Sequence, residues 1–201
     1  MPRHFTDKER EELRKKLLSS AKRLFLQYGL NKTTVSDITD EAKIGKGTFY
    51  SFFNSKGDIY LKFYAEEWSA VQNKMDKKYK NRKGQIDEII LDYIYENRSI
   101  MASHPILSTV HKRYALALIS EPTVTEQLNS FKELSDTHLT ELIKSWFETN
   151  DIKTDVKPET VSGMMRSLSY LNYHKDEIGE DIFDNVIRNF AEGITYTIHK
   201  K

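Results

Sequence analysis

Apolar residues along this chain recur mostly at spacings of three and four, which is the period of a helix with one buried face. Glycine and proline are scarce, at 8 and 4 of the 201 residues. No segment alternates apolar and polar positions in the way that a half-buried strand does. The pattern therefore predicts an all-α protein of about nine helices joined by short connections.

The first helix is expected to start near Thr6 and to end at Gly29, because glycine readily takes the left-handed conformation that terminates helices. Its apolar stripe consists of Leu13, Leu17, Ala21, Leu24, Phe25 and Tyr28. This stripe predicts the face that the helix buries.

Two further helix starts carry the signature of a capping box, in which an N-cap hydroxyl and an acidic side chain three residues later satisfy free N–H groups. Thr34 and Asp37 form the first, and they open a short helix whose inner face would be Val35, Ile38 and Ala42. Ser55 and Asp58 form the second, which opens a long helix reaching toward Lys78.

Between these two starts lies KIGKGTFYSFFNSKG, residues 43–57, with three glycines. A turn and a short helix held between two other helices have the outline of a helix-turn-helix, whose second helix enters the major groove of DNA. Phe49 and Phe53 would face the core, which leaves the remaining small and polar residues of the short helix outward. The residues expected to face DNA, together with those at the neighbouring helix starts, are Thr33, Thr34, Lys46, Gly47, Thr48, Tyr50, Ser51 and Lys56.

These residues resemble the TetR family of bacterial one-component regulators. The resemblance runs through residues 21–60 and rests on the Leu-Phe pair before Gly29, Thr-Thr-Val, Asp-Ile, Lys-Gly-Thr-x-Tyr and Phe-x-x-Lys. It implies a three-helix DNA-binding head, expected at residues 1–55, and a larger helical body at 56–201 that binds a ligand and forms a homodimer through its last two long helices.

Two positions depart from the family pattern. Lys43 stands in the turn where glycine is usual, so either the turn differs or Gly45 takes the strain, since a positive φ costs a lysine about 1 kcal/mol. Phe52 stands where a histidine or tyrosine often reaches phosphate. A phenyl ring cannot form that hydrogen bond, so this contact is not expected here.

Further helices are expected at about 85–103, 106–120, 123–150, 158–174 and 181–199. Bulky or amphipathic side chains on them are of the kind that lines apolar ligand pockets, although ordinary core packing explains them equally. The candidates for binding a small apolar or aromatic effector are Trp68, Tyr93, Met101, Tyr114, Phe131, His138, Trp146 and Tyr170.

The last two helices carry more apolar residues than one inward face requires. The resemblance makes them the expected dimer interface, with Met164, Leu168, Leu171, Ile187, Phe190 and Ile194 as the candidate contacts. A symmetric dimer would present two recognition helices to the halves of an inverted repeat.

Composition and charge narrow the remaining classes of protein. The first 58 residues hold 12 Lys and Arg against 8 Asp and Glu, although the whole chain has a net charge of only +1, so an anionic partner is expected at the front. No apolar run is long enough for a membrane span or a signal peptide, and there is no cysteine. A cytoplasmic protein without membrane contact is expected.

No catalytic constellation, metal-ligand spacing or cofactor motif is present. The GKGT of residues 45–48 lacks both the preceding glycine and the following hydroxyl of a nucleotide-binding loop. The sequence therefore predicts a homodimeric transcriptional regulator, in the first place a repressor, with operator DNA and a small effector as partners and with no cofactor. A helical carrier or enzyme without a DNA role and a sequence-tolerant DNA-packaging protein remain as alternatives.

Overall fold

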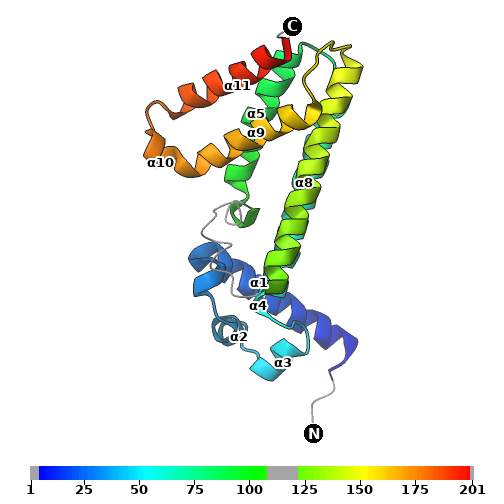
Figure 1. Ribbon diagram of the computed structural model, residues 1–201. Coiled ribbons are helices and arrows are strands. Elements are labelled where there is room, and N and C mark those ends of the chain that lie inside the picture. Colours follow the sequence, from blue (N-terminus) through cyan, green and yellow to red (C-terminus); the bar gives the residue numbers. More distant parts are fainter. Residues whose placement is uncertain (1–4, 108–121, 200–201) are drawn as a thin grey trace. The chain divides into compact units, whose positions relative to one another are not determined.

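The computed structural model describes residues 5–107 and 122–199, and it confirms the all-helical prediction (Figure 1). These residues form nine α-helices and one 3₁₀ helix and contain no strand. In chain order the elements are α1 (Asp7–Lys32), α2 (Val35–Ala42), α3 (Lys46–Tyr50), α4 (Lys56–Tyr79), α5 (Ile86–Ser103), α8 (Pro122–Thr149), α9 (Pro158–Leu171), η1 (Asn172–His174), α10 (Lys175–Ile178) and α11 (Phe183–His199).

The chain divides into two compact units. The first contains Met1–Trp68 together with the described part of Pro105–Leu128, and the second contains Ser69–His104 and Asn129–Lys201. The division falls inside α4, whereas the sequence placed the domain boundary at residue 55, ahead of that helix. The boundary of an independently folding head stays a prediction.

In the first unit α1 begins as the sequence predicts. Thr6 is its N-cap, and the hydroxyl of Thr6 accepts from the N–H of Glu9 while the Glu9 carboxylate accepts from the N–H of Thr6. Gly29 breaks the helix with φ of 79°, and one further turn then runs to Lys32. The predicted stripe is buried at Leu17, Ala21, Leu24 and Phe25 but not at Tyr28, which is 51% exposed.

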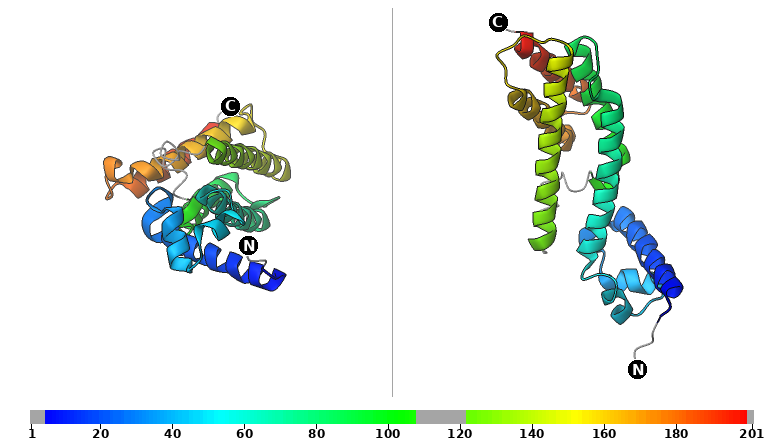
Figure 2. Two further views of the ribbon diagram at one scale, coloured as in Figure 1. Left: turned by 90° about the horizontal axis from the view of Figure 1, so that it is seen from below. Right: turned by 90° about the vertical axis from the view of Figure 1, so that its right-hand side faces the viewer.

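Three helices follow α1 and build the rest of the head (Figure 2). Thr34 caps α2 and shares the predicted box with Asp37, and the inner face of α2 is buried at Ile38 and Ala42. Ser55 accepts from the N–H groups of the first residues of α4, so the second predicted start is also confirmed. The Asp58 carboxylate accepts from the N–H of Asn54.

The second unit is built around an aromatic cluster. Tyr79, Tyr93 and Trp146 meet edge to face, with ring centroids 5.1 to 6.4 Å apart. The indole N–H of Trp146 donates to the carbonyl of Tyr79 at 2.7 Å, and burial raises the pKa of Tyr93. Helix α11 packs on α5 and α9, and Figures 1 and 2 show these three helices together from different directions.

The predicted helices at 85–103, 123–150, 158–174 and 181–199 agree with α5, α8, α9 with η1, and α11 within a few residues. Helix α10 was not predicted, because four residues are too few for a periodic pattern. The helix predicted at 106–120 lies mostly outside the described residues.

Candidate nucleic-acid interface

The turn between α2 and α3 is shaped by Lys43. This residue adopts the left-handed conformation itself, with φ of 56° and ψ of 45°, and the N–H of the next residue, Ile44, donates to the carbonyl of Thr39 at 2.9 Å. Gly45 has an ordinary φ of −68° and serves as the N-cap of α3. Gly45 therefore does not take the strain, which rests on Lys43 itself.

Helix α3 is held by two phenylalanines. Phe49 is fully buried and Phe53 is 8% exposed, and their ring centroids lie 5.9 Å apart, as the four-residue spacing predicts. The opposite side of the helix is accordingly open. Lys46, Gly47, Tyr50 and Ser51 are exposed there, and Tyr50 is 57% exposed with its ring packed edge-on against Phe49.

Gly47 lies inside α3 without a packing reason for being glycine. Apart from its two chain neighbours and the backbone of its own helix, a Cβ built at this position meets no atom of the described residues within 4 Å, and its φ is not positive. Glycine inside a helix costs about 1 kcal/mol relative to alanine. No packing contact among the described residues requires the glycine, and its bare backbone faces open space.

The three predicted contact residues outside α3 take different positions. Thr34 is exposed at the start of α2, where its hydroxyl donates to Asp37 and accepts from the N–H of that residue. Thr33 is only 1% exposed, and its hydroxyl donates to the carbonyl of Gly29, so its side chain does not face outward as predicted. The sequence placed both threonines at the start of α2 and did not reveal that Thr33 is also the C-cap of α1, where its side chain turns back onto that helix.

Lys56 also has a structural role that the sequence did not reveal. Its ammonium donates to the carbonyls of Leu30 and Thr33 at 2.8 and 2.7 Å. The first residue of α4 is thereby tied to the last turn of α1. Whether this ammonium also reaches phosphate stays a prediction.

Helices α1 and α2 are joined by an ion pair between Arg23 and Glu41. The guanidinium donates from Nε and Nη2 to the two carboxylate oxygens, which is the planar two-point geometry that suits arginine. On α2, hydrogen bonds from the backbone N–H and hydroxyl of Thr34 hold the pKa of Asp37 below its usual value. These contacts fix the elements that carry α3.

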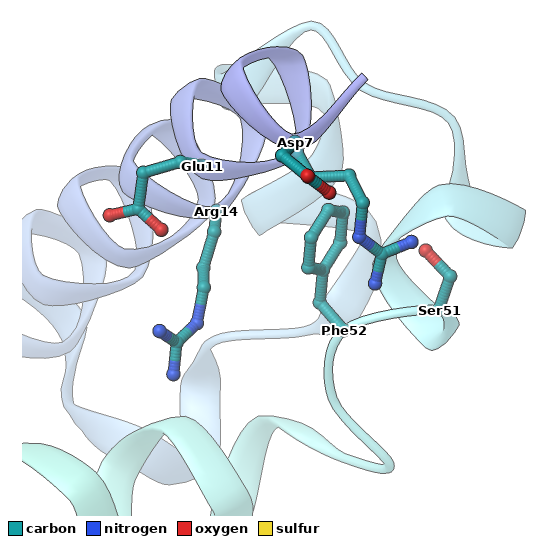
Figure 3. A pocket seen from close by; sticks show the side chains of 6 residues that line it. Asp7, Glu11, Arg14, Ser51 and Phe52 are labelled. Carbon is teal, nitrogen blue, oxygen red and sulfur yellow. The ribbon is translucent and has the colours of Figure 1, made fainter. Parts of the chain in front are cut away.

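Sequence reasoning missed a cleft beside α3. The cleft has a volume of about 330 Å³ and lies between the start of α1 and the end of α3 (Figure 3). The guanidinium of Arg10 lies over the ring of Phe52, 5.0 Å from its centroid. The lining residues are Asp7, Arg10, Glu11, Arg14, Ser51 and Phe52. The only signal in the sequence was the departure from the family pattern at Phe52.

The predicted effector residues lie in different surroundings. Tyr93 and Trp146 come together, but in the packed aromatic core, where Trp146 is fully buried and its N–H is satisfied. Both side chains belong to the core of the second unit, and a contact with an effector stays a prediction. Trp68, Met101 and Phe131 are half-buried and Tyr170 is exposed, while Tyr114 lies outside the described residues.

His138 is the predicted effector residue with the most unusual surroundings. Its Nε2 lies 2.7 Å from Asp76 Oδ1, while Nδ1 is buried and has no hydrogen-bond partner. One turn before Asp76 on α4, the buried Oε1 of Gln72 also has none. Nearby in the chain, Asp136 pairs with Arg166 of α9 at 3.3 Å. The interior of the second unit thus contains unsatisfied polar atoms, which are costly unless something binds them.

The predicted dimer residues divide between two faces. Leu168, Ile187 and Ile194 are at most 4% exposed and pack within their own unit, so they are not available to a partner in this structure. Met164 and Leu171 are half-buried. On α11, Phe190 and Tyr196 are instead 56% and 68% exposed. The helical period identified both faces but could not say which one faces the core.

Searches for two other kinds of site give negative findings. Among the described residues, no three His, Asp or Glu side chains gather in a way that could hold a metal ion. None of the described helices combines the length and the apolarity that crossing a membrane requires.

Comparison with known proteins identifies the region that carries this geometry. Residues 17–62 match the model of the family described as bacterial regulatory proteins, tetR family. The HTH-type transcriptional regulator YhgD of Bacillus subtilis is 27% identical over 176 residues, which is 87% of this chain and 72% of that protein. The matched family and this relative are regulators of transcription and not enzymes.

Solved structures share the fold over most of the chain. A TetR-family transcriptional regulator from Syntrophomonas wolfei superposes with a TM-score of 0.69 at 18% identity, covering 94% of this chain and 96% of that one. The regulator FadR from Bacillus subtilis, solved in complex with stearoyl-CoA, gives a TM-score of 0.64 at 18% identity, covering 90% and 98%. At this level of identity the likeness shows the fold alone.

Proposed function

Because the chain belongs to the TetR family of bacterial transcriptional regulators, we propose that it is a homodimeric cytoplasmic repressor. In this proposal the dimer binds an inverted-repeat operator through its helix-turn-helix and is released by a small apolar or aromatic effector.

The main support for the proposed binding to DNA is the exposed face of α3. Its exposed residues offer an ammonium from Lys46, a phenol from Tyr50 and a bare backbone at Gly47, around which the chain itself leaves open space. Hydroxyl, amino and backbone N–H groups are donors for phosphate and base edges. A glycine that packing does not require suits close approach to a duplex.

Neighbouring groups extend this surface. Thr34 stands exposed at the N-terminus of α2, where free N–H groups and the helix dipole favour phosphate. Thr48 is half-buried on α3 and Ser51 is exposed at its end. We expect Lys46 and Tyr50 to contribute most to affinity, and Thr34 to fix the position of the head on the backbone.

The test is binding of the purified protein to a duplex that it selects from a random pool, beside a scrambled duplex of equal length. We expect the selected duplex to bind at least about 10³-fold more tightly. Lys46→Ala and Gly47→Val should abolish that preference, while Lys62→Ala, which removes an exposed ammonium from α4, serves as the control. Equal affinity for both duplexes would contradict a specific regulator and would indicate a sequence-tolerant DNA-packaging protein.

The proposed effector site lies in the second unit. Burial of the partnerless Nδ1 of His138 and Oε1 of Gln72 supports a ligand with a polar group in addition to an apolar body. The neighbour FadR was solved with stearoyl-CoA, a molecule of that general kind. A ligand that binds better to the conformation unable to hold DNA shifts the population toward release.

The proposed dimer uses the apolar face of α9 and α11 that the second unit leaves exposed. Phe190 and Tyr196 of α11 would bury their rings against a second copy, and Met164 of α9 would add to the contact. A two-fold axis at this face suits an operator with two equivalent halves about one helical turn apart.

Repression is distinguished from activation by a reporter placed behind the selected operator. We expect the protein to lower expression and a bound effector to restore it. A rise in expression on adding the protein would establish an activator instead.

A further inference from the structure

We propose that the cleft beside α3 is a second phosphate-binding site for operator DNA, in which Phe52 holds Arg10 in place. The residues concerned are Asp7, Arg10, Glu11, Arg14, Ser51 and Phe52. This inference rests on the proposed DNA-binding function and adds contacts from α1 that neither the sequence nor the matched family region assigned, because the match begins at residue 17.

The first support is the position of the cleft. Ser51 is the C-cap residue of α3 and Phe52 follows it directly, so the cleft continues the exposed face of the recognition helix. In Figure 3 the side chains of Arg14 and Phe52 come from α1 and from the segment after α3 and lie on the two sides of the cleft. A duplex that meets α3 would therefore bring its backbone next to α1.

The second support is the state of the two arginines. Both are exposed, and within the described part of the chain neither guanidinium forms an ion pair or a hydrogen bond. Arg10 is nevertheless ordered by the Phe52 ring, 5.0 Å below its guanidinium. A guanidinium over an aromatic face keeps the N–H donors in its own plane free, and this planar donor fork suits a phosphate.

The third support is that the proposed site gives a role to the phenylalanine at position 52. A phenyl ring at position 52 cannot donate a hydrogen bond to phosphate, but it can fix the residue that does. Phe52 is thus a positioning residue, and Arg10 makes the contact in place of a hydrogen-bonding side chain at that position.

Two carboxylates also line the cleft and act against an anion. Glu11 is paired with Lys15 at 3.8 Å, and Figure 3 shows its side chain extending away from Phe52 and Ser51. Asp7 lies in the first turn of α1, where it interacts favourably with the helix dipole. Because Asp7 also lines the cleft, its negative charge repels a phosphate there and limits the affinity. Removing this charge should strengthen phosphate binding.

The experiment measures affinity for the selected duplex across a salt series. The affinity falls as salt rises, so log K against log salt has a negative slope. For each phosphate contact that a DNA-binding head loses, this slope should become less negative by about 0.9. We expect Arg10→Ala to weaken binding about fivefold to tenfold with that change of slope, and Arg14→Ala to act in the same direction. Lys16→Ala is the matched control, because it removes one positive charge from an exposed site on α1 outside the cleft.

Two further variants test the role of the ring. Phe52→Leu should weaken binding about threefold, but the double variant Arg10→Ala, Phe52→Leu should bind no more weakly than Arg10→Ala alone. Phe52→Tyr keeps a ring beneath Arg10 and should retain affinity. Asp7→Asn should tighten binding about twofold to fivefold, and thermal unfolding of every variant identifies any loss of folded protein.

The outcomes separate this inference from the proposed function. If Lys46→Ala abolishes selective binding while Arg10→Ala and Arg14→Ala match Lys16→Ala in affinity and slope, the regulator stands and the second phosphate site is wrong. If the wild-type protein shows no preference for the selected duplex, the proposed function itself fails. If Arg10→Ala lowers the thermal stability without changing the salt slope, the Arg10–Phe52 contact stabilises the fold and Arg10 does not bind phosphate.

Discussion

The ammonium group of Lys56 donates a hydrogen bond of 2.7 Å to the main-chain carbonyl of Thr33, across 23 residues of sequence. A second bond of 2.8 Å reaches the carbonyl of Leu30. The lysine thus satisfies carbonyls at the end of α1, where the helix dipole is negative. The residue that the sequence assigned to phosphate has a firm role in holding the head together.

Removing this ammonium should destabilise the head. Lys56→Ala leaves two part-buried carbonyls without their charged donor, and we expect a loss of about 1–3 kcal/mol in the free energy of unfolding, measured by urea denaturation. Lys62→Ala, which breaks an exposed pair with Glu66 four residues away, should cost less than about 0.5 kcal/mol. Equal losses in the two variants would contradict a structural role for Lys56.

Replacing Lys43 should stabilise the protein. This residue holds φ of 56°, so Lys43→Gly relieves left-handed strain, and we expect a gain of about 0.5–1 kcal/mol in the free energy of unfolding. The control Lys16→Gly introduces the same residue into the interior of α1 and should cost about 1 kcal/mol. Chemical denaturation of both variants measures whether each one gains or loses free energy of unfolding. A loss for Lys43→Gly would contradict the proposed strain at position 43.

The capping box of α2 should make stability depend on pH. Hydrogen bonds from the backbone N–H and hydroxyl of Thr34 lower the pKa of Asp37 from its usual 3.8. A carboxyl with a lowered pKa in the folded state stabilises the protein above its unfolded pKa, and that contribution disappears as the pH falls through the folded value.

Melting temperatures of the wild-type protein and Asp37→Asn, measured from pH 7 downward, should therefore converge at acid pH. Asp40→Asn, which removes an exposed carboxylate from the same helix, controls for the change in net charge. A difference between wild type and Asp37→Asn that stays constant down to the lowest pH would contradict the capping role of the charge.

The exposed ring of Phe190 should be required for dimerisation. Phe190→Asp places a charge in the proposed interface, and we expect the dimer dissociation constant to rise at least about 100-fold, measured by sedimentation or light scattering. Leu134→Asp is a matched control, because Leu134 on α8 is 55% exposed compared with 56% for Phe190. If both variants remain dimeric at the same concentrations, the interface lies elsewhere.

Trp146 should act as a core residue. Trp146→Phe removes the N–H that satisfies the Tyr79 carbonyl and leaves a gap in a fully packed site, so we expect a loss of about 2–4 kcal/mol in the free energy of unfolding. Phe147→Leu, at the next and half-buried position, should cost about 1 kcal/mol. Comparable small losses in urea denaturation would mean that the indole lines a loose cavity after all.

Local signals in the sequence were sufficient for the elements of the head. The capping pairs Thr34 with Asp37 and Ser55 with Asp58, the break at Gly29, and the inward pair Phe49 and Phe53 all act over a few residues, so reading them requires no knowledge of distant contacts. For the same reason the bounds of most helices in the body were predicted to within a few residues.

Only the tertiary structure decided which side each helix presents. Ile187 and Phe190 lie three residues apart on α11 and are equally apolar, yet one is buried and the other is 56% exposed, because α5 and α9 cover only one side of the helix. The cleft between Arg10 and Phe52 joins residues 42 positions apart, and Lys56 reaches carbonyls 23 and 26 positions away. Such pairings depend on how helices pack, and a periodic pattern carries no information about its partner.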